Sequence, residues 1–168
     1  MADLDSVIKL PLEIAIKLSQ NELLQRLLVV DSPDVEGVSF SKLSWDELIN
    51  NGYISTSPIV FDDNTNKGIN TFACVLLDSM DFFNYDNNIS VAGKICIGTN
   101  FNHLRLKNNE LRLLKMVKEI KDTIDNQKFS ASGKLEITSI GSIAYSKYCF
   151  GYIISFKTKE QEEREIDI

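Results

Sequence analysis

The chain has 168 residues, of which 43% are hydrophobic and 25% are charged, so it is long enough to bury the core of one domain. Its formal net charge of −6 argues against a nucleic-acid-binding surface, because phosphate contacts need concentrated basic residues. No apolar run approaches the roughly 18 to 20 residues that span a bilayer, and the acidic start lacks the basic region of a secretory signal. These features predict a protein that stays in a cytosol and does not enter a membrane.

Helical patterns dominate the segment before residue 53. Residues 10–18 fit either a helix or a strand. The spacing of Ser19 and Glu22 is that of a capping box, and the leucine-rich segment that follows predicts a helix. The same spacing recurs at Ser44 and Glu47. It predicts a second, short helix that a following glycine closes, because glycine readily adopts the left-handed conformation.

From residue 53 the pattern changes to strands and turns. Three extended segments have apolar or alternating character, and polar turn residues separate them. The middle segment is almost continuously apolar, which predicts a strand that is covered on both faces. The extended segments are residues 54–61, 70–77 and 89–97, and the turns are residues 62–68 and 84–88.

A long helix is predicted from about residue 108 to residue 126. Its apolar stripe consists of Leu113, Val117, Ile120 and Ile124, which lie on one side of a helix. The basic residues in and before this segment are interpreted as its solvated side. They are Arg105, Lys107, Arg112, Lys115, Lys118 and Lys121.

Two strands are predicted after the helix, at residues 131–139 and 148–156. In the first, Leu135 and Ile137 face one side while polar residues face the other. In the second, the alternating aromatic and aliphatic residues share one face. These residues are Tyr148, Phe150, Tyr152, Ile154 and Phe156.

The order of these elements predicts a single α+β domain over residues 1–168. A mixed or antiparallel sheet packs against the long helix, with the N-terminal helices beside it. Residues 53–156 form the strand-helix-strand core, and residues 157–168 form a charged C-terminal arm.

Few residues suggest chemistry. Cys74, Cys96 and Cys149 lie in apolar runs without a C-x-x-C pair, which favours buried, reduced thiols over a redox or metal role. His103 is the only histidine, and its place before the predicted helix favours a capping or surface role. No catalytic, cofactor-binding or metal-binding residue is predicted.

Two groups of acidic and amide residues allow a second interpretation. Asp78, Asp81 and Asp86 could serve as paired carboxylates in glycoside hydrolysis, but a turn rich in asparagine favours local hydrogen bonds instead. Residues 62–66 have the oxygen-ligand spacing at which a calcium loop begins. The glycine falls one position late and Ala73 replaces the bidentate glutamate, which favours a surface turn.

The order of the elements resembles that of the tail-completion and tail-terminator proteins of tailed bacteriophages, small neck proteins that form rings between portal and tail. The segment 35–53, with its extra short helix, departs from that pattern. The matching segments are residues 21–28, 89–97, 132–137 and 150–156, together with the helix that carries the stripe of Leu113, Val117, Ile120 and Ile124.

The resemblance implies a structural virion protein without catalytic residues, assembled in the host cytoplasm. It would form a sixfold or twelvefold ring in the head-to-tail connector and contact portal-side and tail-side proteins. Acidic side chains toward a central channel would let genomic DNA pass without binding it. Loop residues 61–68 and the C-terminal arm would reach neighbouring subunits. The candidate subunit-contact residues are Phe61, Asp62, Asp63, Asn64, Lys67, Lys157, Lys159, Glu162, Glu163 and Arg164.

Two other classes of function remain open from the residues themselves. One is a small cytosolic α+β binding domain that acts as a monomer or dimer on a protein or a small molecule. The other is a metal-independent enzyme that uses carboxylates.

Overall fold

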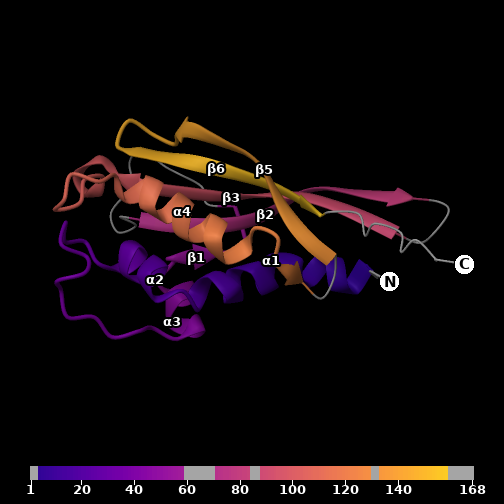
Figure 1. The fold of residues 1–168 in the computed structure, drawn as a ribbon, viewed down its shortest axis with the longest axis horizontal. Helices are drawn as coiled ribbons and strands as arrows, with labels where there is room; N and C mark the ends of the chain where they lie inside the picture. Colours follow the sequence, from indigo (N-terminus) through magenta and orange to yellow (C-terminus); the bar gives the residue numbers. More distant parts are fainter. Residues whose placement is uncertain (1–3, 59–70, 84–87, 130–132, 159–168) are drawn as a thin grey trace, which may run out of the picture.

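The structure is a computed structural model that describes residues 4–58, 71–83, 88–129 and 133–158. It has an α+β fold in which helices cover one face of a curled six-stranded sheet (Figure 1). The helices are α1 (Leu4–Ser19), α2 (Glu22–Val29), α3 (Trp45–Asn50), the 3-10 helix η1 (Phe101–His103) and α4 (Arg112–Ile124). The strands are β1 (Ile54–Ser55), β2 (Thr71–Phe83), β3 (Asn88–Asn100), β4 (Lys128–Phe129), β5 (Gly133–Ala144) and β6 (Cys149–Thr158).

The strand order is β1-β2-β3-β6-β5-β4, and only the short β1–β2 pair is parallel. The register shifts at Asp78 in β2 and at Thr138 in β5, and such bulges bend a strand and increase its twist. The sheet curls so far that α1 contacts both β1 and β4, which lie at its opposite edges. The concave side therefore holds the main hydrophobic core.

The faces of the central strands follow the predicted alternation. On β3, Val91, Ile95 and Ile97 are buried in the main core, and on β6 so are Ile154 and Phe156. The first half of β2, residues 71–75, is buried on both faces, as its apolar run predicts. Local periodicity thus identified the inner face of the sheet correctly.

Strand boundaries differ from the predictions at three places. β1 has only two residues, because the proline at position 58 follows closely and cannot donate to a ladder. β5 continues to Ala144, beyond the predicted end at residue 139. Tyr148 precedes β6 and is 49% exposed, so it does not share the buried face with Phe150 and Phe156.

Of the two capping boxes predicted for the N-terminal helices, the first is wrong and the second is confirmed. Residues 10–18 belong to α1, a helix of 16 residues. Ser19 does not cap α2, because its hydroxyl donates to the carbonyl of Ile16, and Asn21 accepts from the backbone N–H of Leu24 instead. The second capping box is present as predicted, with Ser44 and Glu47 exchanging hydrogen bonds.

Helix α4 is shorter than predicted, with 13 residues that begin at Arg112. Residues 107–110 form a turn in which Asn109 has a φ of 63°, a left-handed conformation that asparagine tolerates. The predicted stripe is confirmed, because Leu113, Ile120 and Ile124 are buried in the core together with Val117. No helix in the described part of the chain is long and apolar enough to cross a membrane.

Arg112 contradicts the interpretation of the basic residues as a solvated helix side. It is 1% exposed, and its guanidinium donates to four backbone carbonyl oxygens. The acceptors are Leu27 and Val30 at 2.7 Å, His103 at 2.8 Å and Ser32 at 3.0 Å.

The carbonyls of Leu27 and Val30 belong to the C-terminal end of α2, where helix carbonyls lack intrahelical partners and carry partial negative charge. Burial lowers the pKa of Arg112, and the nearby Asp31 carboxylate raises it. The guanidinium keeps its charge even so, because its ordinary pKa lies far above neutrality. Arg112 therefore joins the start of α4 to the end of α2 and to the loops on either side.

We expect Arg112→Met to lower the free energy of unfolding by on the order of 3 to 5 kcal/mol, because four buried or partly buried carbonyls lose their charged donor. Chemical denaturation monitored by circular dichroism would measure the change. Arg112→Lys should recover only part of the loss, since an ammonium lacks the planar fork that reaches several segments. The matched control is Lys121→Met on the exposed side of the same helix, which should change stability by less than about 0.5 kcal/mol. Equal effects of the two methionine variants would contradict the conclusion that the Arg112 hydrogen bonds stabilise the fold.

Candidate assembly surfaces

Most of the predicted subunit-contact residues lie outside the described part of the chain. Lys157 is described and lies on β6, where its Nζ is 3.9 Å from Oε2 of Glu136, its register partner on β5. Both side chains are substantially exposed, so this pair adds little to stability. The residues outside the described ranges are Phe61, Asp62, Asp63, Asn64, Lys67, Lys159, Glu162, Glu163 and Arg164.

Helix α1 carries apolar residues on two sides. One side buries Val7, Leu10, Ile14 and Leu18 in the core. The other side exposes a row at a spacing of four residues, with 37% to 60% of each residue accessible. We call this row, which consists of Leu4, Ile8, Leu12 and Ile16, the α1 outer row.

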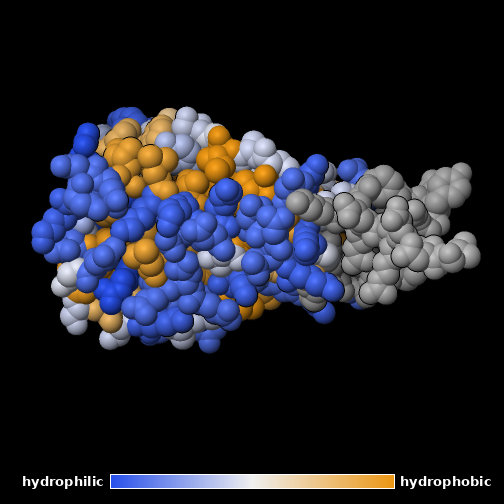
Figure 2. Space-filling model, viewed as in Figure 1, coloured by the Kyte–Doolittle hydropathy of each residue, from blue (hydrophilic) through white to orange (hydrophobic). Residues whose placement is uncertain are grey.

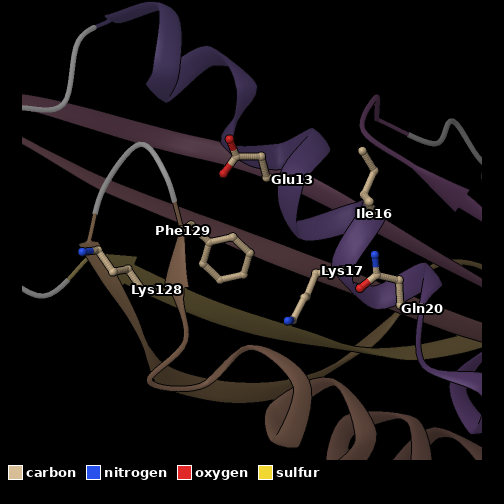
Figure 3. Close-up of a pocket in the computed structure, with 6 residues that line it drawn as sticks. All are labelled: Glu13, Ile16, Lys17, Gln20, Lys128 and Phe129. Carbon is tan, nitrogen blue, oxygen red and sulfur yellow. The ribbon is translucent and has the colours of Figure 1, made fainter.

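An open hollow of about 370 Å³ lies beside the end of the α1 outer row. Figure 3 shows Glu13, Ile16 and Lys17 of α1, with Gln20 just after it, on one side and Lys128 and Phe129 of β4 on the other. Ile16 belongs to both the row and the hollow, and the buried Phe129 lies opposite it. The lining combines apolar side chains with charges of both signs, which suits contact with an amphipathic segment.

A second apolar surface lies at the hairpin end of β5 and β6, where Figure 2 shows hydrophobic residues gathered. Phe101 is 50% exposed and its backbone N–H donates to the carbonyl of Tyr148, which is 49% exposed. Ile140 on β5 is 43% exposed, and Phe150 on β6 is half-buried. We call Phe101, Ile140, Tyr148 and Phe150 the β5–β6 end surface.

Among the described residues, part of the outer edge of β5 is unpaired beside the β5–β6 end surface. The short β4 pairs only with Gly133 and Lys134, and the turn after α4 bonds to Leu135 and Ile137. Beyond Ile137, no described strand pairs with this edge. An exposed strand edge next to apolar side chains is a typical site for the addition of a strand from another chain.

The three cysteines lie on the convex face of the sheet, around Tyr145. Cys74 and Cys96 are direct register partners on β2 and β3, and the ring of Phe72 packs edge-on against Tyr145 at 5.3 Å between centroids. Cys74 and Cys149 are buried, as predicted, whereas Cys96 is only half-buried.

Burial opposes the ionisation of Cys96, Cys149 and Tyr145 in this cluster. Burial raises the pKa of the Cys149 thiol to about 11 and also raises the pKa of Cys96. Burial and the neighbouring thiols raise the pKa of Tyr145. Among the described residues, no group of three or more His, Cys, Asp or Glu side chains is arranged to hold a metal ion. Because their pKa values are raised, the thiols of Cys96 and Cys149 are poor nucleophiles at neutral pH.

Two of the three predicted carboxylates lie in a strand and not in a turn. Asp78 and Asp81 are part of β2, and Asp86 lies outside the described residues. Asp78 occupies the bulge, and its Oδ1 is 2.7 Å from Nζ of Lys94, an ion pair that raises the pKa of this lysine. The strand prediction ended too early because a bulge can place a charged residue in an otherwise apolar strand without breaking it.

The remaining polar residues of the helix α4 region have local roles. His103 is the last residue of η1, and its Nδ1 is 3.0 Å from the carbonyl oxygen of Asp31. This contact agrees with the local role predicted for His103. Lys107 pairs with Asp34 at 2.9 Å, and the contact lowers the pKa of that carboxyl. Lys115 pairs with Glu36 at 2.6 Å. These contacts fix the loop after α2 and pair Lys107 and Lys115 with acidic residues of that loop.

The cysteine cluster predicts a loss of stability at alkaline pH. Well below pH 9 the Cys149 thiol is protonated in both the folded and the unfolded chain. Between pH 9 and about 11 the unfolded thiol ionises while the folded one does not, so the free energy of unfolding falls as the pH rises. Denaturation at several pH values should show that Cys149→Ala removes on the order of 1 to 2 kcal/mol of this fall. Parallel pH profiles for the variant and the wild type would show that Cys149 is not responsible.

A model of the YomW family matches residues 21–158, which include every described strand and all the described helices except α1. No curated protein matches the chain. The family has a phage-derived name, which indicates a phage protein. Because the match extends over most of the sequence, the chain belongs to the YomW family.

Proposed function

We propose that this protein is a structural component of a phage particle that forms a ring in the head-to-tail connector, between portal-side and tail-side proteins. The phage origin of the family supports a role in a particle. The observation that carries the proposal is the β5–β6 end surface, where exposed apolar side chains adjoin an open strand edge. Such a surface is suited to lasting contact with another chain.

A ring requires a head-to-tail contact between two different surfaces of the subunit. The β5–β6 end surface provides one of them. Its complement would come from the neighbouring subunit, with loop residues 61–68 and the C-terminal arm as the predicted contributors. In this arrangement the net charge of −6 favours a channel that repels DNA phosphates, so that the genome passes without sticking.

The experiment that tests the proposal is the analysis of purified particles of the phage that encodes this chain. Quantitative mass spectrometry should find the protein at six or twelve copies per particle, and electron cryomicroscopy should place it in a ring below the portal. Particles that lack the protein would contradict the proposal and favour a separate binding domain.

We expect Ile140→Lys to lower incorporation into particles at least tenfold, because a charge at the β5 edge opposes both apolar contact and strand addition. Complementation of a deletion phage, followed by immunoblotting of purified particles, would measure it. Ile140 is 43% exposed, so the thermal unfolding midpoint should change little. The matched control is Ile49→Lys on α3, where the replaced residue is 37% exposed and far from β5. Normal incorporation of Ile140→Lys would remove this surface from the assembly contact.

A further inference from the structure

A contact through the β5–β6 end surface would leave the α1 outer row exposed to solvent. Its four aliphatic side chains are 37% to 60% exposed along a helix of 16 residues, which is about 24 Å long. Residues four apart on a helix are neighbours, so the row forms a continuous apolar strip on the molecular surface. A strip of this shape fits the side of another helix.

The charges beside the strip indicate which helix fits. The adjacent row, also at a spacing of four, reads Asp5, Lys9, Glu13 and Lys17, so its signs alternate. A second copy of α1 in parallel would place like charges opposite each other. A second copy in antiparallel orientation places Asp5 opposite Lys17 and Lys9 opposite Glu13, so that every acid faces a lysine.

We propose that α1 pairs with α1 of a second copy, antiparallel, about a two-fold axis near residues 10 and 11. In this arrangement Leu4 packs against Ile16 of the other copy, and Ile8 packs against Leu12. The hollow between α1 and β4 receives the end of the incoming helix, because Ile16, Lys17 and Phe129 line it (Figure 3). Leu4 of the second copy thereby meets apolar side chains, and Asp5 meets Lys17.

This contact goes beyond the proposed function. A two-fold contact uses the same surface of both copies and closes as a dimer, whereas a ring needs two different surfaces. The free subunit is therefore a dimer before assembly. One helix pair buries less than the roughly 1,200 to 2,000 Å² of a standard stable interface, so the dimer is weak and depends on concentration. We expect a dissociation constant on the order of tens of micromolar.

Sedimentation equilibrium of the full-length chain tests the pairing and its charges. Asp5→Lys should weaken the dimer roughly fivefold to tenfold, because it places two lysines opposite each other twice in every dimer. Asp5→Lys combined with Lys17→Asp should restore the wild-type constant, since the reversed pattern is complementary again. Ile8→Glu should leave a monomer. Ile140→Lys on the β5–β6 end surface is the matched control and should dimerise as the wild type does.

Cysteine cross-linking tests the orientation. With the axis near residues 10 and 11, the two copies of position 12 lie about 5 Å apart along the helix direction, and those of position 4 about 20 Å apart. Leu12→Cys alone should therefore form a disulfide-linked dimer under mild oxidation, and Leu4→Cys alone should not. A mixture of Leu4→Cys and Ile16→Cys should link the two chains. The wild type is the control, because it shows how much disulfide-linked dimer the three native cysteines form by themselves.

Three results would overturn the proposal: a monomeric wild type at the highest concentration, a double charge reversal that does not restore pairing, or efficient linkage of Leu4→Cys to itself. Circular dichroism of each variant separates loss of pairing from loss of folding. Ile8 is 60% exposed, so Ile8→Glu is expected to fold. Failure of this pairing would leave the ring proposal untouched, because the particle experiments depend on a different surface.

Discussion

The guanidinium of Arg112 joins the start of α4 to the end of α2 and to the loops beside them. It lies at the start of α4, where the positive end of the helix dipole disfavours a cation. The carbonyls at the C-terminal end of α2 compensate, because they offer partial negative charge at 2.7 Å. The apolar stripe of α4 packs the helix on the sheet, and Arg112 fixes the start of the helix against α2 and against the carbonyl of His103 in η1. Since Phe101 also lies in η1, this hydrogen bond connects Arg112 to the element that supplies one residue of the β5–β6 end surface.

On both faces of the sheet, aromatic rings pack closely against glycines of the central strands. On the concave face, a Cβ at Gly93 would lie 2.5 Å from the ring of Phe156. On the convex face, a Cβ at Gly151 would collide with the carbonyl of Ile97 and with the ring of Tyr145. These contacts lock the register of β3 against β6 from both sides. Tyr145 follows β5 directly, so the same contacts fix the hairpin end where the apolar surface and the open edge meet.

The sequence predicted those features that depend on local periodicity. The inner faces of β3 and β6 and the stripe of α4 are set by spacings of two and of three to four residues, which the chain displays directly. Features that depend on distant partners were missed. Arg112 resembles the neighbouring lysines until the end of α2, about 80 residues away in sequence, is brought beside it. The choice of Asn21 over Ser19 as a cap depended on side-chain geometry that spacing alone does not contain. Of the predicted contact residues only Lys157 lies in the described chain, whereas both apolar surfaces emerged from exposure in the folded molecule.

Helix α1 shows why exposure had to come from the structure. Its residues 10–18 fitted a helix or a strand equally well, because apolar residues occur on two of its sides and weaken the helical period. The core accounts for one side, with Leu10, Ile14 and Leu18 fully buried. The core does not cover Ile8 and Leu12, whose side chains remain substantially exposed. Polar residues would be more favourable at such positions if they faced only solvent. The exposed apolar residues that made the sequence pattern ambiguous are therefore the same residues that we propose to pack against another molecule. The alternating charges beside them fit a second copy of α1 in antiparallel orientation.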